Sequence, residues 1–234
     1  MCGRFTQRFS WREVHRFLNL AGPAVELTPR YNVAPGQAVA AVCTLRGERR
    51  LSMLHWGLIP SWSRSPKSMR RPINARAETA AEKPMFRGAF RAKRCLIPAD
   101  GFYEWTREGP VKRPYLIGRA DGGPMAFAGL WERWRVAEDA ELPRSLAGLA
   151  PGEAVETCAI LTTAASPAIA PVHHRMPAML APDAFGPWLE CRPVPLRPAA
   201  DVELAVRPVG RWVNNPAHDD PRCVEPTEPD LAGS

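Results

Sequence analysis

The stretch CLIPADGFYEW (residues 95–105) contains two short apolar segments on either side of an Asp-Gly pair. An Asp-Gly dipeptide between hydrophobic runs is a strong short-range signal for a tight turn that joins two strands. The carboxylate of Glu104 lies in the second segment, between Tyr103 and Trp105. The stretch therefore predicts a pair of β-strands and places an acidic residue on one of them.

Strand-like segments of this kind recur along the chain, and many of its 26 prolines separate them. Proline is tolerated at strand ends because no ladder hydrogen bond is lost there. The strand-like segments cover residues 38–45, 51–59, 94–98, 101–105, 115–118, 125–134 and 156–165. This pattern is typical of an α+β fold with a curved, mainly antiparallel sheet.

Few helices are expected. Ser10 and Glu13 form a capping-box pattern, and the apolar residues that follow lie on one helical face, which predicts a helix close to the amino terminus. Two more short helices are expected at residues 79–90 and 182–190, with a surface loop at 138–156.

The chain has 234 residues, near the upper end of single-domain size. We expect one domain over residues 1–218 and a disordered tail over 219–234, because the tail is polar, acidic and rich in proline. The sequence has no apolar run of about 18 residues, as a membrane span requires, and no segment typical of a secretory leader. These features predict a cytoplasmic protein.

The chain is basic, with 31 Lys and Arg against 24 Asp and Glu and a pI near 9.4. A basic chain is typical of proteins that bind polyanions such as nucleic acids. The preference for arginine suits phosphate contact and is equally expected from codon usage in a GC-rich genome. The six cysteines are dispersed without a Cys-x-x-Cys pair, so we expect reduced thiols, no zinc site and no cofactor.

The chain begins MCGRF. Methionine is usually removed when the second residue is small, so the mature protein would carry a free α-amine and a thiol on Cys2. That pair is a 1,2-aminothiol. The alternative is an ordinary buried cysteine with an inert thiol.

Two further stretches carry polar residues in a pattern that suggests chemistry. In RRPINARAET (71–80), Asn74, Arg76 and Glu78 alternate, so an extended chain would project all three from one face. The alternative is a loop with a solvated charged face. Glu104 is expected to have a raised pKa in its aromatic surrounding and to act as a general acid, unless it is a plain exposed strand residue.

PVHHRMPAML (171–180) places His173, His174 and Arg175 within an apolar stretch. Histidine transfers protons near neutral pH, and Arg175 could hold a phosphate. Adjacent histidines on a strand point to opposite faces, so we expect no metal there. Trp62 follows a proline among polar residues, where an exposed indole suits stacking on a base.

The chain resembles the SOS response-associated peptidase family over residues 1–215, whose members crosslink to abasic sites in single-stranded DNA. The motifs that carry this resemblance are MCGRF, YNVAP (31–35), WGLIPSW (56–62), INARAET (73–79), IPADGFYEW (97–105), ILTTA (160–164) and HHRMP (173–177). The resemblance implies a barrel-like core with a few flanking helices. It also implies a monomer whose partner is single-stranded DNA that contains an abasic site.

The resemblance also implies roles for individual residues. Cys2 would be the nucleophile, and the remaining active-site residues would be Asn74, Glu104 and His173. The implied DNA contacts are Arg4, Arg76 and Arg175 on phosphates, with Trp62, Pro35 and Thr162 along the DNA path. The family motif His-x-Arg selects His173 over His174, and Ser63 stands where another member has a second tryptophan.

The implied chemistry requires a cysteine at the terminus. An α-amine has a pKa of about 7.7–8.0 against about 10.4 for lysine, so part of it is neutral and nucleophilic in cells. It can attack the sugar aldehyde, and the thiol can then close a thiazolidine ring. Met1 would be removed by autoproteolysis or by a methionine aminopeptidase; the sequence favours neither.

Two other functions are compatible with these residues. An amino-terminal-nucleophile glutamine amidotransferase can also begin Met-Cys-Gly, although the chain has no downstream Asn-Gly pair for an oxyanion hole. A non-covalent single-strand-binding module would use only the basic and aromatic residues, and its affinity would fall steeply with salt. The sequence identifies no protein partner.

Overall fold

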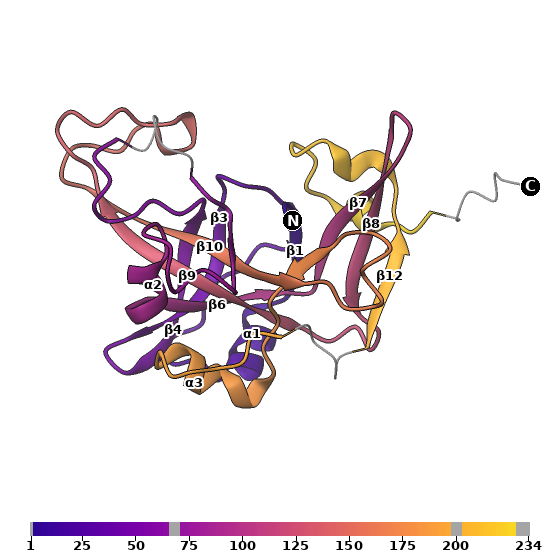
Figure 1. Cartoon of the computed structure of the whole chain (residues 1–234), viewed down its shortest axis with the longest axis horizontal. Coiled ribbons are helices and arrows are strands. Elements are labelled where there is room, and N and C mark those ends of the chain that lie inside the picture. Colours follow the sequence, from indigo (N-terminus) through magenta and orange to yellow (C-terminus); the bar gives the residue numbers. More distant parts are fainter. Residues whose placement is uncertain (1, 66–70, 198–202, 228–234) are drawn as a thin grey trace, which may run out of the picture.

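The structure is a computed structural model that describes residues 2–65, 71–197 and 203–227. Its centre is a small β-barrel (Figure 1). The barrel strands are β3 (Ala38–Leu45), β4 (Glu48–Trp56), β6 (Arg94–Ala99), β9 (Met125–Arg135) and β10 (Ala154–Ala164). β10 pairs with both β4 and β9, which closes the ring β10–β4–β3–β6–β9. The expected α+β fold with a mainly antiparallel, barrel-like sheet is confirmed.

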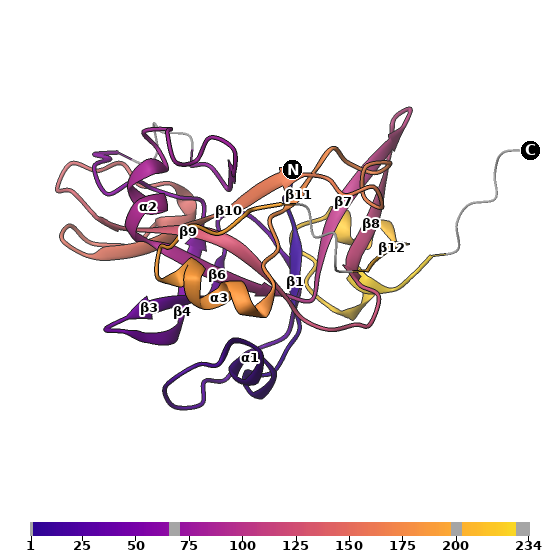
Figure 2. The same ribbon diagram turned by 60° about the horizontal axis from the view of Figure 1, so that its bottom comes forward.

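A second antiparallel sheet projects from one side of the barrel (Figure 1). Its strands, in spatial order, are β12 (Leu204–Pro208), β8 (Val111–Arg119), β7 (Gly101–Glu108), β1 (Phe5–Gln7) and β2 (Arg30–Val33). β1 therefore lies inside this sheet, between β7 and β2. The amino end of β1 lies between the barrel strands and the β7–β8 arm in both views (Figures 1 and 2).

The Asp-Gly pair at 100–101 is a corner between the two sheets. In the described part of the chain β6 pairs with β3 and β9, whereas β7 pairs with β1 and β8. The two strands predicted on either side of the Asp-Gly pair are confirmed, but they belong to different sheets and do not pair with each other. Every residue of β6 is buried, and both edges of this strand are paired inside the barrel, with β3 and with β9. The Asp100 carboxylate fixes the corner by accepting the Arg8 N–H at 2.9 Å.

Strand alternation divides the core into an inner and an outer layer. Val39, Ala41 and Cys43 of β3 face the barrel interior with Cys95 and Cys158, so three free thiols lie inside the barrel. The outer layer packs against three helices, α1 (Trp11–Leu18), α2 (Arg87–Ala92) and α3 (Phe185–Leu189). Figure 2 shows α1 and α3 on the side of the barrel opposite the amino end of β1.

The expected helices are confirmed at two of three places. Ser10 and Glu13 form both hydrogen bonds of the capping box at the start of α1. The 182–190 segment is a 3-10 turn, η2 (Pro182–Ala184), followed by α3. The helix expected at 79–90 is confirmed only at its end, where α2 begins at Arg87, and residues 79–86 form turns. Pro84 lacks an N–H and disfavours helical geometry at the residue before it, so the helix starts after the proline.

The segment 219–227 is ordered, which corrects the expectation of a disordered tail from residue 219. The segment contains the 3-10 turn η4 (Pro221–Val224), which packs against the preceding 3-10 turn η3 (Arg211–Asn214) and against β2, and Cys223 is fully buried. Residues 228–234 lie outside the described residues. Within the described ranges, no helix is both long enough and apolar enough to cross a bilayer.

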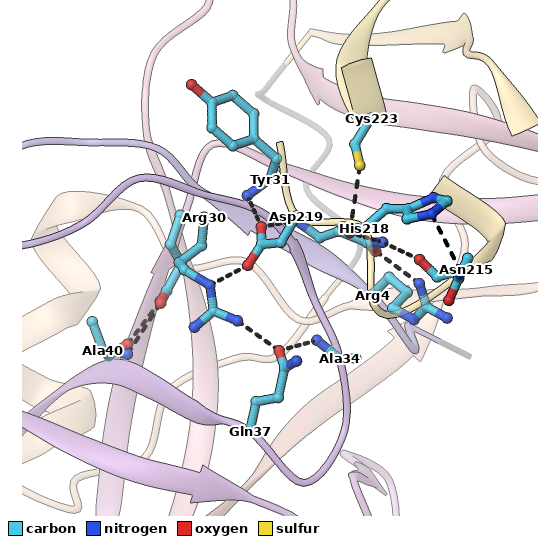
Figure 3. Close-up of polar contacts among 12 residues, drawn as sticks. Arg4, Arg30, Tyr31, Ala34, Gln37, Ala40, Asn215, His218, Asp219 and Cys223 are labelled. Carbon is cyan, nitrogen blue, oxygen red and sulfur yellow. Dashed lines mark hydrogen bonds and ion pairs between the residues drawn. The ribbon is translucent and has the colours of Figure 1, made fainter. Parts of the chain in front are cut away.

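Asp219 explains why this polar segment is fixed (Figure 3). Its carboxylate accepts the backbone N–H groups of Tyr31 at 2.5 Å and Asn32 at 2.9 Å, and it pairs with Arg30. Asp219 therefore accepts the backbone N–H groups at the outer edge of β2. Composition indicates disorder only where such long-range partners are absent.

Gly129 provides a test of the barrel packing. A Cβ at this position would lie 2.7 Å from the Cys95 Sγ and 3.0 Å from the Ile97 Cδ1, and both side chains are short or stiff. Gly129→Ala should therefore cost about 1–3 kcal/mol in the free energy of unfolding, as overpacking does. Urea denaturation measures the change.

Two variants control this measurement. Gly88→Ala, on α2, meets only a Glu132 oxygen at 3.8 Å and should be neutral or stabilising. Adding Cys95→Ala to Gly129→Ala removes the closest atom and should recover part of the loss. An unchanged stability for Gly129→Ala would contradict this description of the barrel interior.

Asp219→Ala should destabilise the protein by about 2–4 kcal/mol, because three groups of β2 lose a charged acceptor. It should also expose the segment after residue 210 to protease. Denaturant unfolding and limited proteolysis measure the two effects. Asp183→Ala, at an exposed position of η2, is the matched control and should leave both measurements unchanged.

Candidate functional site

The end of β10 positions the candidate site. β4 pairs with β10 as far as Cys158, and β5 (Asn74–Arg76) then takes over that edge at Ile160. On the other edge β9 pairs as far as Ile160, and β11 (Arg175–Pro177) takes over at Thr162. Two short strands from distant parts of the sequence therefore flank the same end of β10.

Cys2 lies at this end of the barrel, ahead of β1. It is fully buried and packs in the interior cluster. The Asn74 side chain donates from its Nδ2 to the Cys2 carbonyl oxygen at 2.8 Å. The Asn74 Oδ1 is buried without a hydrogen-bond partner among the described residues. Asn74 thus fixes the backbone of Cys2 and keeps an acceptor beside it.

Glu104 approaches Cys2 from β7. Its side chain is buried, and burial raises its pKa above the ordinary value. Burial raises the pKa of the Cys2 thiol far above its usual range, and the nearby Glu104 charge adds to that rise. The raised pKa of Glu104 does not come from its aromatic neighbours in the sequence. Alternate residues of a strand point to opposite faces, and Tyr103 packs with Val209 in another cluster.

His173 is the histidine that reaches Glu104. Its Nδ1 lies 4.0 Å from a Glu104 carboxylate oxygen and accepts the Arg175 N–H at 2.9 Å. Burial lowers the pKa of His173, which favours the neutral ring. His174 is exposed and stacks on His173 with 4.4 Å between ring centroids, and repulsion from His173 lowers the pKa of His174.

Arg175 is hydrogen-bonded within the protein at the site. Its guanidinium donates to both carboxylate oxygens of Glu78, at 2.6 and 2.8 Å, and to the Thr162 carbonyl at 2.5 Å. These bonds lower the pKa of Glu78. β5 ends at Arg76, so Glu78 lies in the following turn and does not continue the strand face as expected. Arg175 links the turn after β5 to β10 and β11.

Arg4 also has internal partners. It donates to the Asn32 Oδ1 at 2.7 Å and to the Val213 carbonyl at 2.9 Å, in the network around Asp219 (Figure 3). Asn32 is fully buried and donates in turn to carbonyls of residues 213, 215 and 218. Sequence reasoning missed Asn32, although it lies in the YNVAP motif. Its burial, which no local pattern reveals, is what makes it structural.

The predicted DNA contacts fall into two groups. Arg76, Trp62 and Pro35 are exposed, and Trp62 is 60% exposed. Thr162 is fully buried, and its Oγ1 donates to the Ala75 carbonyl at 3.4 Å. Arg4, Arg175 and Thr162 therefore shape the site from within, and their contact with DNA stays a prediction.

The described residues contain no group of three or more His, Cys, Asp or Glu side chains that could hold a metal ion. The groups that gather are instead proton carriers and a buried thiol. The arrangement places Glu104 and His173 beside Cys2, whose backbone is fixed by Asn74. It is suited to proton transfer around a reaction at Cys2.

Fold and site together define a barrel protein whose second residue is the candidate reactive centre. The chain belongs to the SOS response associated peptidase (SRAP) family, whose model matches residues 1–216. This confirms the resemblance seen in the sequence. Residues 217–227 extend beyond the match and pack against the second sheet.

Two named relatives align with nearly the whole chain. The abasic site processing protein YoqW of Bacillus subtilis is 35% identical, over 96% of this chain and 99% of its own. The abasic site processing protein YedK of Escherichia coli is 29% identical, over 97% and 100%. A crystal structure of a protein from Bacteroides thetaiotaomicron superposes with a TM-score of 0.81 at 26% identity, covering 97% of this chain and 100% of that one.

Glu104→Gln should stabilise the protein at neutral pH. The pKa of Glu104 is raised in the folded state, so ionisation destabilises the fold. This penalty is absent below the pKa of the unfolded carboxyl, about 4.3, and grows as pH rises toward the folded-state pKa. The variant should therefore exceed the parent in urea midpoint near pH 7 and match it near pH 4.

The exposed Glu138→Gln is the matched control and should show no such dependence on pH. Equal midpoints for Glu104→Gln and the parent across this range would contradict the burial of an ionisable Glu104.

Proposed function

We propose that this protein recognises abasic sites in single-stranded DNA and traps them covalently through Cys2. The observation that carries the proposal is that three polar side chains gather around Cys2. Asn74, Glu104 and His173 come from three distant segments and surround the amino-terminal Cys2. The names of the relatives from Bacillus subtilis and Escherichia coli, abasic site processing proteins, support the same substrate.

The amine of Cys2 is the first nucleophile in this proposal. Burial keeps the thiol protonated, because its pKa is far above the usual range. The neutral amine attacks the aldehyde carbon of the ring-opened sugar, and loss of one water gives an imine. The sulfur then adds to the imine carbon, and the thiol proton passes to the nitrogen. The product is a thiazolidine, with one water released overall.

The neighbouring residues supply orientation and protons. Asn74 holds the Cys2 carbonyl at 2.8 Å and so directs the terminus. Glu104, with its raised pKa, is the proton donor to the departing water. The neutral His173 assists opening of the sugar ring. High effective molarity then drives ring closure by the thiol on the same residue.

Exposed residues near the site contact the strand. Arg76 carries a cation for a phosphate, and Trp62 and Pro35 offer surfaces on which bases stack. Arg4, Arg175 and Thr162 act mainly by holding the site together through their internal bonds. The protein acts as a cytoplasmic monomer in this proposal.

The reaction requires removal of Met1, which lies outside the described residues. Either autoproteolysis assisted by Glu104 and the Cys2 thiol or a methionine aminopeptidase would expose the amine. Intact mass of protein made with and without the aminopeptidase separates these routes.

Cys2→Ala should abolish formation of an adduct that survives SDS and heat with abasic single-stranded DNA. An uncleaved amino-terminal tag should do the same, because it blocks the amine. Glu104→Gln should slow adduct formation by about 10²-fold while leaving the fold intact. Denaturing gels and intact-mass spectrometry measure the adduct and its linkage.

Cys191→Ala is the matched control, because Cys191 is a half-buried free cysteine outside the cluster that contains Cys2, and it should crosslink normally. Crosslinking by Cys2→Ala would overturn the proposal. Release of ammonia from glutamine would indicate the amidotransferase alternative. Binding fully reversed by denaturant would indicate a non-covalent module.

A further inference from the structure

A cleft opens beside the site, at the segment 71–73 that leads into β5. It encloses about 680 Å³. The turn of Pro35 and Gly36 forms one wall, and the segment 143–145 at η1 (Arg144–Leu146) forms the other. Trp56 and Ile73 form an apolar floor. In Figure 1 the loop that carries η1 extends from the barrel on the side away from α1 and α3.

The cleft adjoins the candidate site through one residue. Ile73 directly precedes Asn74, which bonds to Cys2. The Ile73 carbonyl accepts the indole N–H of Trp56 at 2.8 Å, so the floor is rigid. A strand that delivers a sugar to Cys2 would therefore enter or leave beside Ile73.

Two arginines line the cleft. Arg71 is partly buried and donates to the Ser145 hydroxyl at 2.9 Å, which joins its two sides, and Arg144 is exposed at the rim. Neither guanidinium has a carboxylate partner among the described residues, unlike Arg175, which is paired with Glu78. Burial without an anion lowers the pKa of Arg71. A partly desolvated cation without a counter-charge marks a place for an anion.

We infer that this cleft binds the nucleotide next to the abasic site, with Arg71 and Arg144 on its phosphodiester and its base against the apolar floor. The inference rests on the proposed function, which it deepens by adding a binding site on the strand. The volume suits a nucleotide, since small-ligand sites typically measure about 300–1,000 Å³. Arginine's forked donors match a phosphate better than a single amine does.

The test measures binding separately from covalent capture. All variants are made in a Cys2→Ala background, and fluorescence anisotropy gives their affinity for a labelled oligothymidylate over a range of salt concentrations. Arg71→Gln should weaken binding about tenfold and reduce the salt slope by about 0.7, the contribution of one phosphate on a single strand. Arg144→Gln should weaken binding about threefold. Arg71→Lys should restore the slope and only part of the affinity.

Arg12→Gln and Arg16→Gln, on the exposed face of α1, are the matched controls. They remove the same charge at a distance from the cleft and should change affinity less than about twofold. Thermal unfolding checks that each variant is folded. Unchanged affinity in folded Arg71→Gln, or an equal loss in the α1 controls, would overturn the inference.

A second measurement distinguishes this inference from the proposed function. With Cys2 present, Arg71→Gln should crosslink abasic DNA to the parent's full yield at saturating DNA and more slowly below saturation. A parent that forms no crosslink would refute the proposed function, and the affinity series would still decide the role of the cleft. A parent that crosslinks together with unaffected Arg71 and Arg144 variants would refute the cleft alone.

Discussion

Immobilising the amino terminus is the constraint on which the rest of the structure depends. Chain ends usually fray, because few contacts hold them. Here Cys2 is buried in the barrel interior, and Asn74 donates to its carbonyl at 2.8 Å. β1 is held between β7 and β2, so the residues that follow are fixed on both edges. The proposed reactive residue near the terminus thus has the rigidity that active sites usually obtain from the middle of an element.

The same burial sets the charge state of the site. A buried thiol and a buried carboxyl both resist ionisation, and a buried imidazole resists protonation. Cys2, Glu104 and His173 are therefore biased toward their neutral forms. Neutral groups can exchange protons with an incoming sugar without first separating charge in a low-dielectric interior. The environment favours a proposed reaction that starts from an amine and proceeds by proton transfer.

The arginines have either a structural role or a charge available for a ligand, according to their partners. Arg4 donates hydrogen bonds to a backbone carbonyl, and Arg175 donates to a carbonyl and to Glu78. Both residues therefore hold separate segments together. Arg71 and Arg76 have no carboxylate bonded to them among the described residues, so their charge is available for a ligand. The excess of positive charge in the sequence therefore overstates the number of arginines free to meet an anion.

The sequence determined the features that depend on near neighbours. The capping box of α1, the strand-like apolar run of β3 and the family motifs are readable because each involves residues only a few positions apart. The partners of Arg4, the burial of Glu104 and the order of the 219–227 segment were decided by the tertiary structure. Each depends on residues from distant segments, such as Arg4 with Val213 and Tyr31 with Asp219, which only the closure of the barrel and the packing of the second sheet bring together. The local sequence pattern predicts which face of an element is buried. It does not predict which distant residues pack against that face.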